Sequence, residues 1–246
     1  MLQDARSMKN VLALDTATEA LSVALQCGDT MHAHFEIAPR LHAQKILPLI
    51  DRLLGEAGIT IADVDAFVFG RGPGAFTGVR TAVAVVQGLA FSHNKPVYGV
   101  STLLAMAAGA RRQHGVSQVM PVIDARMGEV YVAGYCFVQG DWLSVLPEAV
   151  LPPNQLQWPV VGEWFGCGTG WQVYGETLRA CLSSSQTSAN LVLEAGDGRL
   201  PDARDMLTLA LPALQRGEGV PAEQALPVYL RDQVADKPKS ALPLPK

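Results

Sequence analysis

Residues 69–80, Phe-Gly-Arg-Gly-Pro-Gly-Ala-Phe-Thr-Gly-Val-Arg, connect an apolar strand predicted at 66–69 to an apolar helix predicted at 79–91. Gly72 and Gly74 can adopt backbone angles that a Cβ atom forbids, and Pro73 stiffens the turn between them. Thr77 is placed to cap the N-terminus of the helix, so that the amides of its first turn face the loop. The stretch therefore predicts a strand, a glycine-rich turn and a helix in direct succession.

A glycine loop that leads into a helix has two alternative roles. Its amides can bind a phosphate, or its small residues can bring the helix close to the sheet. The spacing here matches neither G-x-x-x-x-G-K-[ST] nor G-x-G-x-x-G. Because glycine serves backbone geometry more often than chemistry, we favour the structural turn.

The helix predicted at 79–91 is apolar around nearly its whole circumference, interrupted only by Arg80, Thr81 and Gln87. Such a helix is expected to be buried on all sides. One side can pack on the sheet of its own chain, and the other is covered either by more of this chain or by a second polypeptide. Ala84 and Gly88, four residues apart, would allow a partner helix to approach closely.

The composition excludes several classes of protein. A chain of 246 residues that is 49% hydrophobic and 17% charged suits one large domain or two lobes. A net charge of -4, without a lysine or arginine cluster, argues against unaided binding of nucleic acid. The four cysteines lack a C-x-x-C spacing, which suggests neither a zinc site nor a disulfide framework. Because no apolar run is long enough for a membrane span and residues 1–10 lack a signal-peptide core, we expect a cytoplasmic protein.

The first half of the chain predicts one mixed sheet. Residues 11–25 form a hairpin with Asp15 and Thr16 at its turn, a third strand lies around 32–36, and a helix with an apolar arc spans 41–57. The glycine loop, its helix and a strand at 96–100 complete the order β-β-β-α-β-α-β. His42 near the start of the first helix is interpreted as a packed residue, because no second ligand lies nearby.

The second half begins in the same way, which suggests an internal duplication. Residues 120–132 again combine an apolar strand, an Asp at its end (Asp124), a short turn and an alternating strand. A helix at 101–113, capped by Ser101 or Thr102, links the halves. A glycine turn with Gly168 and Gly170 leads into a helix at 171–182, a polar loop follows at 183–190, and a last helix is predicted at 202–215. Residues 1–7 read as a leader, and 232–246 as a disordered tail.

Two Asp-bearing hairpins in two similar lobes resemble the α/β fold of actin, hexokinase and Hsp70, with lobes at 8–102 and 103–231. The individual motifs resemble the bacterial TsaB family of tRNA threonylcarbamoyladenosine biosynthesis proteins. The motifs that carry this resemblance are specific only as a set: LALDTATEALSVAL (12–25), HAQKILP (42–48), GRGPGAFTGVR (70–80), YGVSTL (98–103), IDARMGEVY (123–131) and PVYLR (227–231).

The resemblance implies a non-catalytic subunit. Members of the family bind a catalytic paralogue, TsaD, and with the ATPase TsaE support transfer of a threonylcarbamoyl group to the adenosine beside the anticodon of ANN-decoding tRNAs. ATP and metal are therefore expected on the partner subunits, tRNA is contacted through the complex, and the chain alone is expected to form a homodimer. The paralogue's metal-binding H-x-x-x-H corresponds to Thr102 and Met106, and a hydroxyl and a thioether are poor replacements for imidazole.

Two sets of site residues follow from this reading. The predicted partner interface consists of His42, Ile46, Leu47, Ile50, Leu54, Thr77, Arg80, Val83, Ala84 and Gln87. A nucleotide or phosphate, if one binds, would contact Asp15, Thr16, Gly72, Gly74, Asp124, Gly168 and Gly170.

Two alternatives remain open. In an ATPase or phosphotransferase of the same fold, Asp15 and Asp124 would lie near Mg²⁺ and nucleotide. However, strand-terminal Asp residues also cap turns, and Arg126 and Met127 stand where such ATPases favour small residues. A metallopeptidase is the weaker alternative, because the chain contains no H-E-x-x-H or other ligand cluster.

Overall fold

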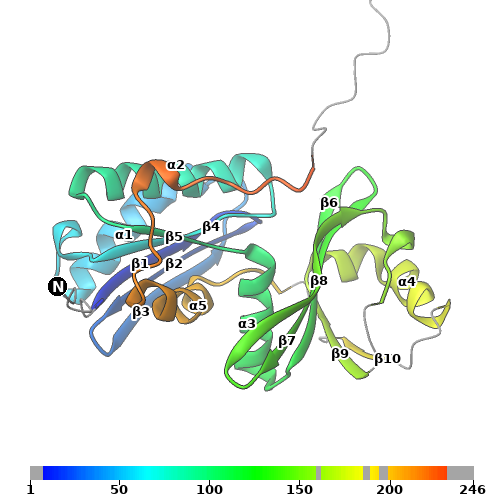
Figure 1. Ribbon diagram of the computed structural model, residues 1–246. Coiled ribbons are helices and arrows are strands. Elements are labelled where there is room, and N and C mark those ends of the chain that lie inside the picture. The colour runs from blue at the N-terminus through cyan, green and yellow to red at the C-terminus, as the bar shows by residue number, and fades with distance from the viewer. Residues whose placement is uncertain (1–7, 159–161, 185–188, 194–198, 232–246) are drawn as a thin grey trace, which may run out of the picture.

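The computed structural model describes residues 8–158, 162–184, 189–193 and 199–231. Its strands form two five-stranded sheets with the orders β3-β2-β1-β4-β5 and β10-β9-β6-β7-β8 (Figure 1). The first sheet contains β1 Asn10–Asp15, β2 Ala20–Cys27, β3 Thr30–Ile37, β4 Ala66–Gly70 and β5 Val97–Val100. The second contains β6 Gln118–Arg126, β7 Glu129–Val138, β8 Asp141–Leu151, β9 Gly162–Cys167 and β10 Ala189–Leu193.

The strand orders confirm the duplication. In both sheets the third, second, first, fourth and fifth strands of the unit lie side by side in that order. The first three strands of each unit pair antiparallel, and the fourth pairs parallel to the first and to the fifth. This is the two-lobed α/β arrangement of the actin and hexokinase type that the two hairpins predicted.

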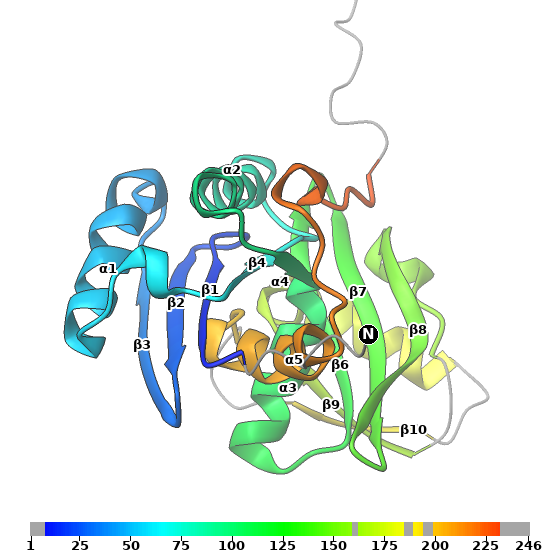
Figure 2. The ribbon, with the colours of Figure 1, turned by 60° about the vertical axis from the view of Figure 1, so that its left-hand side comes forward.

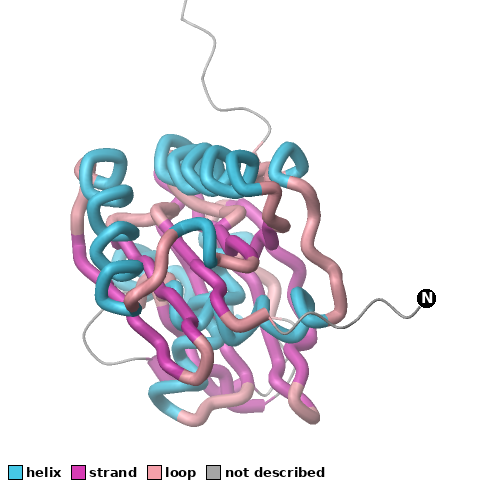
Figure 3. The backbone as a smooth tube through the Cα atoms, turned by 90° about the vertical axis from the view of Figure 1, so that its left-hand side faces the viewer, coloured by secondary structure: helices cyan, strands magenta, loops and turns pink. Residues whose placement is uncertain are grey.

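Helices cover the sheets in layers. They are α1 His42–Ala57, α2 Phe76–His93, α3 Thr102–His114, α4 Thr169–Ser184 and α5 Ala203–Gln215, with short 3-10 turns at Ile61–Asp63, Pro153–Gln155 and Ala222–Gln224. In Figures 2 and 3, α1 and α2 lie over the same face of the first sheet, and α5 lies on the opposite face. α3 stands between the two units (Figure 1), where it contacts α5 on one side and β6 on the other. None of the described helices is long and apolar enough to cross a membrane.

The apolar stripe of α1 explains why this helix packs where it does. Ile46, Leu49, Ile50, Leu53 and Leu54 are buried, together with the inward side chains of β1, β2 and β4. The helix ends at Gly58, whose left-handed backbone suits a residue without a Cβ atom. The predicted helix at 41–57 is thus confirmed.

The last helix corrects the predicted lobe boundary. The sequence assigned 103–231 to the second lobe, but α5 packs against β1, β2, β4 and β5 of the first sheet. Met206, Leu207 and Ala210 share a core with Val11 and Val68. An amphipathic stripe shows that a helix is half buried, but it does not show which sheet buries it. The chain after β10 therefore returns to the first unit.

A C-terminal strap, defined as residues 219–231, then runs along α2. Val220 and Val97 exchange backbone hydrogen bonds, the Gln87 side chain donates to the carbonyl of Ala225, and the amide of Val228 donates to Arg71. At its end, the guanidinium of Arg231 pairs with Glu129 of the second unit. The strap thus spans both units.

The remaining local predictions have different outcomes. α4 extends to Ser184 and β10 begins at Ala189, so both ends of the predicted loop at 183–190 are wrong. The predicted leader at 1–7 and tail at 232–246 lie outside the described residues. The Ser101 cap is confirmed, because the Ser101 hydroxyl accepts a hydrogen bond from the amide of Leu104.

Candidate functional site

The glycine loop packs directly against the β1–β2 turn. A Cβ atom on Gly74 would lie 2.4 Å from the carbonyl oxygen of Ala17, and one on Gly78 would lie 2.0 Å from that of Thr16. Both distances are too short for any side chain. The Thr16 hydroxyl also donates to the carbonyl of Gly78, at 2.7 Å. The glycines therefore bring α2 against the turn, which supports the structural interpretation of the loop.

This contact also explains why the predicted Thr77 cap is wrong. α2 begins at Phe76, and Ala75 occupies the cap position without a side-chain hydrogen bond. The amide of Ala75 donates to the carbonyl of Ala17, so the β1–β2 turn fixes the chain where a capping side chain was expected. Thr77 lies within the first turn of the helix and is exposed.

Asp15 is sealed beneath the same loop. Its side chain has 0% exposure, and its Oδ1 accepts a hydrogen bond from the amide of Ala17 at 2.9 Å. Its Oδ2 has no hydrogen-bond partner in the described part of the chain and lies where a Cβ atom on Gly70 would be. Burial raises the pKa of Asp15 to about 7, against the opposing effect of the Ala17 amide. This carboxyl group is a poor ligand for an ion in solution.

Asp124 occupies the corresponding position in the second unit but has a different environment. Its Oδ1 accepts a hydrogen bond from the amide of Arg126, and its Oδ2 pairs with the Arg126 guanidinium at 2.9 Å. The same guanidinium reaches Glu19 of the first unit at 3.4 Å. Arg126 therefore neutralises the carboxylate that an ATPase of this fold would direct at Mg²⁺.

A cleft of about 800 Å³ lies between the two units. Thr16, Thr77, Asp124 and Thr169 line it, and Tyr229 and Arg231 of the strap close one side. Of the residues predicted to contact a nucleotide, Thr16, Gly74 and Asp124 line the cleft, whereas Asp15, Gly72, Gly168 and Gly170 do not.

The glycines of the second unit also have a packing role. A Cβ atom on Gly168 would lie 2.3 Å from the backbone oxygen of Val122. A Cβ atom on Gly170 would lie 2.4 Å from the Val122 side chain. Gly72 adopts a φ of +97°, which favours glycine. These three glycines therefore set the backbone geometry, and the predicted phosphate contacts remain without geometric support.

The positions that correspond to the paralogue's histidines lie in the core. Thr102 and Met106 of α3 both have 0% exposure. The Met106 methyl group occupies space that a Cβ atom on Gly168 would need, and the Thr102 hydroxyl has no hydrogen-bond partner among the described residues. Within the described ranges, no group of three His, Cys, Asp or Glu side chains could hold a metal ion.

The predicted interface residues on α1 and α2 divide into two groups. Ile46, Ile50, Leu54 and Val83 belong to the core of this chain and cannot offer contact area to another protein. By contrast, Leu47 is 52% exposed, and Thr77, Arg80 and Ala84 are also exposed.

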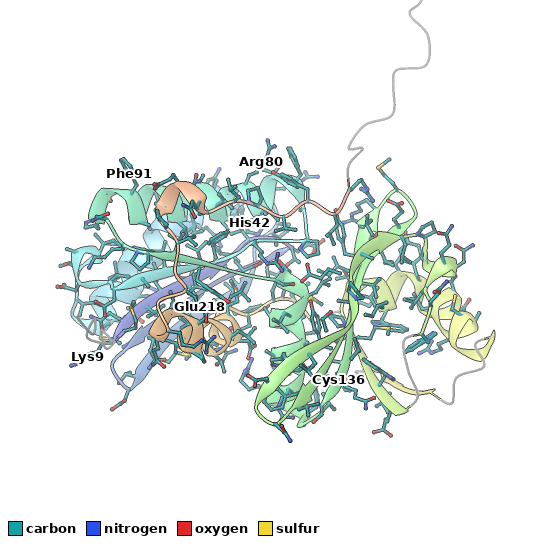
Figure 4. All side chains as sticks on the ribbon, in the orientation of Figure 1. Lys9, His42, Arg80, Phe91, Cys136 and Glu218 are labelled. Carbon is teal, nitrogen blue, oxygen red and sulfur yellow. The ribbon has the colours of Figure 1, made fainter. Side chains whose placement is uncertain are left out.

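Of the two alternatives for α2, enclosure on all sides by its own chain is therefore wrong, and cover by a second polypeptide stays a prediction. Phe91 at its far end is 76% exposed, and Figure 4 shows Arg80 and Phe91 on the outer side of the helix. We define the outer helix face as the exposed residues Leu41, Ala43, Leu47, Phe76, Arg80, Ala84, Gly88 and Phe91.

His42 and Gln87 lie at the borders of this face. His42 is partly buried, lines the cleft, and has a buried Nε2 without a hydrogen-bond partner in the described residues. Gln87 is half-buried because it binds the strap.

The strap brings residues to the site that the sequence reasoning did not assign. The Arg80 guanidinium stacks 3.7 Å from the Phe76 ring centroid and donates a hydrogen bond to the Tyr229 hydroxyl at 2.7 Å. Tyr229 and Arg231 lie in the PVYLR motif at 227–231, so the motif was the signal that could have placed them here.

The comparisons with known proteins agree with this architecture. The TsaD family, described as tRNA N6-adenosine threonylcarbamoyltransferase, matches residues 33–239. The protein TsaB of Escherichia coli K12, named for tRNA threonylcarbamoyladenosine biosynthesis, is 45% identical over 92% of this chain and 96% of its own length. The TsaB protein of Haemophilus influenzae is 40% identical over 92% of this chain.

A solved structure is similarly close. YeaZ from Pseudomonas aeruginosa superposes with a TM-score of 0.82 at 50% identity, and the match covers 91% of this chain and all of that one. Together with the duplicated fold and the motifs, these similarities show that the chain belongs to the TsaB family.

Proposed function

We propose that this chain is a non-catalytic subunit in the biosynthesis of threonylcarbamoyladenosine in tRNA. In this role it binds and activates a TsaD-like catalytic paralogue, together with a TsaE-like ATPase. The observation that carries the proposal is the outer helix face, which is apolar and exposed in a chain whose relatives are named for this modification. Exposed apolar patches of this kind mark protein interfaces.

The core packing at the paralogue's metal position supports a role without chemistry of its own. Thr102 and Met106 lack imidazole or carboxylate donors and are fully buried, so an ion there would need both new ligands and new space. ATP and metal then belong to the partner subunits. The net charge of -4 agrees with contact to tRNA through the complex rather than through this chain alone.

The residues that define the outer helix face are mostly uncharged, whereas Asp51, Arg52 and Glu56 of α1 are exposed outside this set. Apart from Arg80, the outer helix face consists of aliphatic, aromatic and small residues. Ala84 and Gly88 face outward one turn apart, and a Cβ atom on Gly88 would meet nothing within 4 Å. A helix of the partner can therefore approach α2 closely, and Leu47 of α1 and Phe91 of α2 offer larger apolar contacts. The homodimer predicted for the free chain would use the same face.

The test is a charge placed on an exposed position of this face. The substitutions Leu47→Glu and Ala84→Glu leave the core intact, whereas Val83→Glu would place a carboxylate in the core and is unsuitable. Val173→Glu on α4 is the matched control, because Val173 is 57% exposed and lies in the other unit.

Binding to a purified TsaD-like paralogue is measured by isothermal titration calorimetry, and folding by circular dichroism. We expect each substitution on the face to weaken binding at least a hundredfold and the control to leave it unchanged. Folded Leu47→Glu and Ala84→Glu chains that bind as tightly as the unsubstituted chain would refute the docking surface.

The ATPase alternative rests only on the presence of the cleft. Its two carboxylates are a sealed Asp15 and an Asp124 that is paired with Arg126. Measurable steady-state ATP hydrolysis by the purified chain, lost on Asp124→Asn, would favour this alternative over a non-catalytic subunit.

A further inference from the structure

The distal strap, defined as residues 226–231, borders the cleft and is not anchored by buried side chains of its own. Earlier in the strap, Ala222 and Ala225 are 5% and 0% exposed and belong to the core beneath α1 and α2. None of the six distal residues is buried. Because apolar burial is the main force that holds a segment in place, the distal strap depends on a small number of contacts at three places.

The first contact joins the distal strap to the glycine loop. The amide of Val228 donates to the carbonyl of Arg71 at 2.7 Å. A Cβ atom on Gly72 would lie 3.0 Å from the carbonyl oxygen of Val228, so the absence of a side chain allows this close approach. The motifs at 70–80 and 227–231, which are far apart in the sequence, therefore meet at this point.

The second contact joins the distal strap to the outer helix face. The ring centroid of Tyr229 lies 5.6 Å from that of Phe76, and the Tyr229 hydroxyl accepts a hydrogen bond from Nε of Arg80. Because the Arg80 guanidinium also lies over the Phe76 ring, a ring from α2 and a hydroxyl from the strap together fix this side chain. Arg80 is the only charged residue in the set that defines the outer helix face. The position of the strap therefore determines how this charge is presented.

The third contact joins the distal strap to the second unit. The Arg231 guanidinium pairs with Glu129 through Nη2 at 2.5 Å and through Nε at 3.1 Å. It also lies 3.7 Å from the sulfur of Met127 and 3.4 Å from the carbonyl oxygen of Arg126, on the turn between β6 and β7. The Arg231 side chain is 16% exposed, so its charge-assisted hydrogen bonds are better shielded than those of a surface ion pair. Arg231 thus holds the end of the strap across the cleft (Figure 1).

We infer that the distal strap is a latch, and that its closure prepares the outer helix face for the catalytic paralogue. In the closed state, Arg231 is paired with Glu129, and Tyr229 holds Arg80. In the open state, the distal strap leaves the second unit and pivots beyond Ala225, which stays in the core. The two units remain joined through α3 in both states. This inference rests on the proposed function, because the latch acts on the surface proposed for docking.

The two states differ in what docking costs. In the closed state the Arg80 side chain is already ordered, and Tyr229, which is 43% exposed, adds apolar area beside Phe76. In the open state a partner must order Arg80 itself and loses the contact with Tyr229. Because immobilising a long side chain opposes binding, the closed state binds the paralogue more tightly. A change at Arg231, which is not part of the outer helix face, therefore alters partner binding through the population of the closed state.

The first experiment measures closure of the latch in the full chain alone, by hydrogen exchange of single amides followed by NMR. The Val228 amide is bonded to Arg71 in the closed state and is released when the distal strap opens. The Val220 amide is bonded to Val97 at the anchored end of the strap and serves as an internal reference.

In the Arg231→Gln chain, exchange at Val228 should be at least tenfold faster, and exchange at Val220 should not change. The matched control is Arg216→Gln, which removes the exposed ion pair with Glu218 in the first unit. It should leave exchange at both amides as in the unsubstituted chain.

The second experiment measures binding of these chains to a purified TsaD-like paralogue by isothermal titration calorimetry, with folding checked by circular dichroism. Arg231→Gln should weaken binding at least fivefold. Glu129→Gln, which removes the same ion pair from the second unit, should weaken it equally. The double variant should bind no more weakly than either single variant, because both substitutions remove one contact. Arg216→Gln should bind like the unsubstituted chain.

Each contrary result overturns a different part of the proposal. Unchanged exchange at Val228 in the Arg231→Gln chain would refute the latch. Faster exchange with unchanged affinity for the paralogue would refute the coupling between the latch and the docking surface. If the exchange results are as expected but the unsubstituted chain does not bind the paralogue, the proposed function is refuted, and the coupling with it.

Discussion

The two units of the molecule share a strand order, but the aspartates at corresponding positions, Asp15 and Asp124, have different environments. In the first unit, Asp15 is sealed beneath the glycine loop, and one of its oxygens has no hydrogen-bond partner among the described residues. In the second, Asp124 stays at the cleft and is neutralised by Arg126. In each case Oδ1 accepts the amide two residues on. The duplicated position thus retains its role as a turn cap in both units, and in neither is the carboxylate free for an ion in the cleft.

A second difference lies between the third and fourth strands. The first unit has the 16-residue helix α1 there, and in the second the described residues contain only the 3-residue turn Pro153–Gln155. As a result, the first unit presents two neighbouring helices with an exposed outer face, and the second presents only α4 in the described residues. The contrast explains why the proposed partner surface belongs to one unit although the fold is duplicated.

The largest expected effect breaks the packing of the first unit. Gly78→Ala would place a Cβ atom 2.0 Å from the backbone oxygen of Thr16, so the turn or the helix must move, at a cost of about 4 kcal/mol in unfolding free energy. Gly88→Ala in the same helix meets nothing and should stabilise by about 0.5–1 kcal/mol. Gly170→Ala, which meets the Val122 side chain first, should cost less than Gly78→Ala.

Urea unfolding followed by circular dichroism measures these changes. A Gly78→Ala chain as stable as the Gly88→Ala chain would show that the close approach of α2 to the β1–β2 turn does not constrain the fold.

The next prediction concerns the pH dependence of stability, in which Asp15 and Asp124 should differ. The pKa of Asp15 is raised by burial from 3.8 to about 7, so the folded chain holds a proton that the unfolded chain has released. The contribution of protonated Asp15 to the unfolding free energy is fully present below about pH 4 and is lost as the pH rises toward 7. The loss between pH 5 and pH 8.5 amounts to about 3 kcal/mol. Asp15→Asn cannot ionise and should lack this loss.

The measurement is the unfolding free energy of both chains at pH 5 and pH 8.5. As the pH rises, the unfolding free energy of the Asp15→Asn chain should increase relative to that of the unsubstituted chain. The Asp124→Asn chain, changed at a carboxylate already paired with Arg126, should show no such increase. Equal pH dependence of the Asp15→Asn and unsubstituted chains would mean that Asp15 ionises without cost in the folded state.

Much of the fold was predictable from local patterns. The alternation in 11–25 and 120–132 predicted both hairpins, and the apolar arc of 41–57 predicted α1, because these patterns depend on periods of 2 and 3.6 residues. The destination of α5 was not predictable in this way, since its stripe fits either sheet. The start of α2 was also missed, because a carbonyl of the β1–β2 turn, distant in sequence, fixes the chain at Ala75.

The candidate site was predictable only in outline. The motifs at 42–48 and 70–80 indicated the right helices, but a spacing pattern could not distinguish Ile50 and Val83, which face the sheet, from Leu47 and Ala84, which face outward. The environment of Asp15 depends on the missing Cβ atom of Gly70, a contact between strands that no single stretch reveals.

The smallest expected effect concerns the ion pairs across the cleft. Arg126 is 74% exposed in its side chain and links Asp124 to Glu19 of the first unit. Because exposed ion pairs contribute little, Arg126→Ala should lower the unfolding free energy by less than about 1 kcal/mol, close to the effect of Arg216→Ala, which removes the exposed pair with Glu218.

Apolar contacts of α3 with both units, through Ala105 on one side and Leu103 and Met106 on the other, should instead hold the units together. A loss of more than about 2 kcal/mol on Arg126→Ala, at pH 7 and low salt, would assign that role to the charges at the cleft.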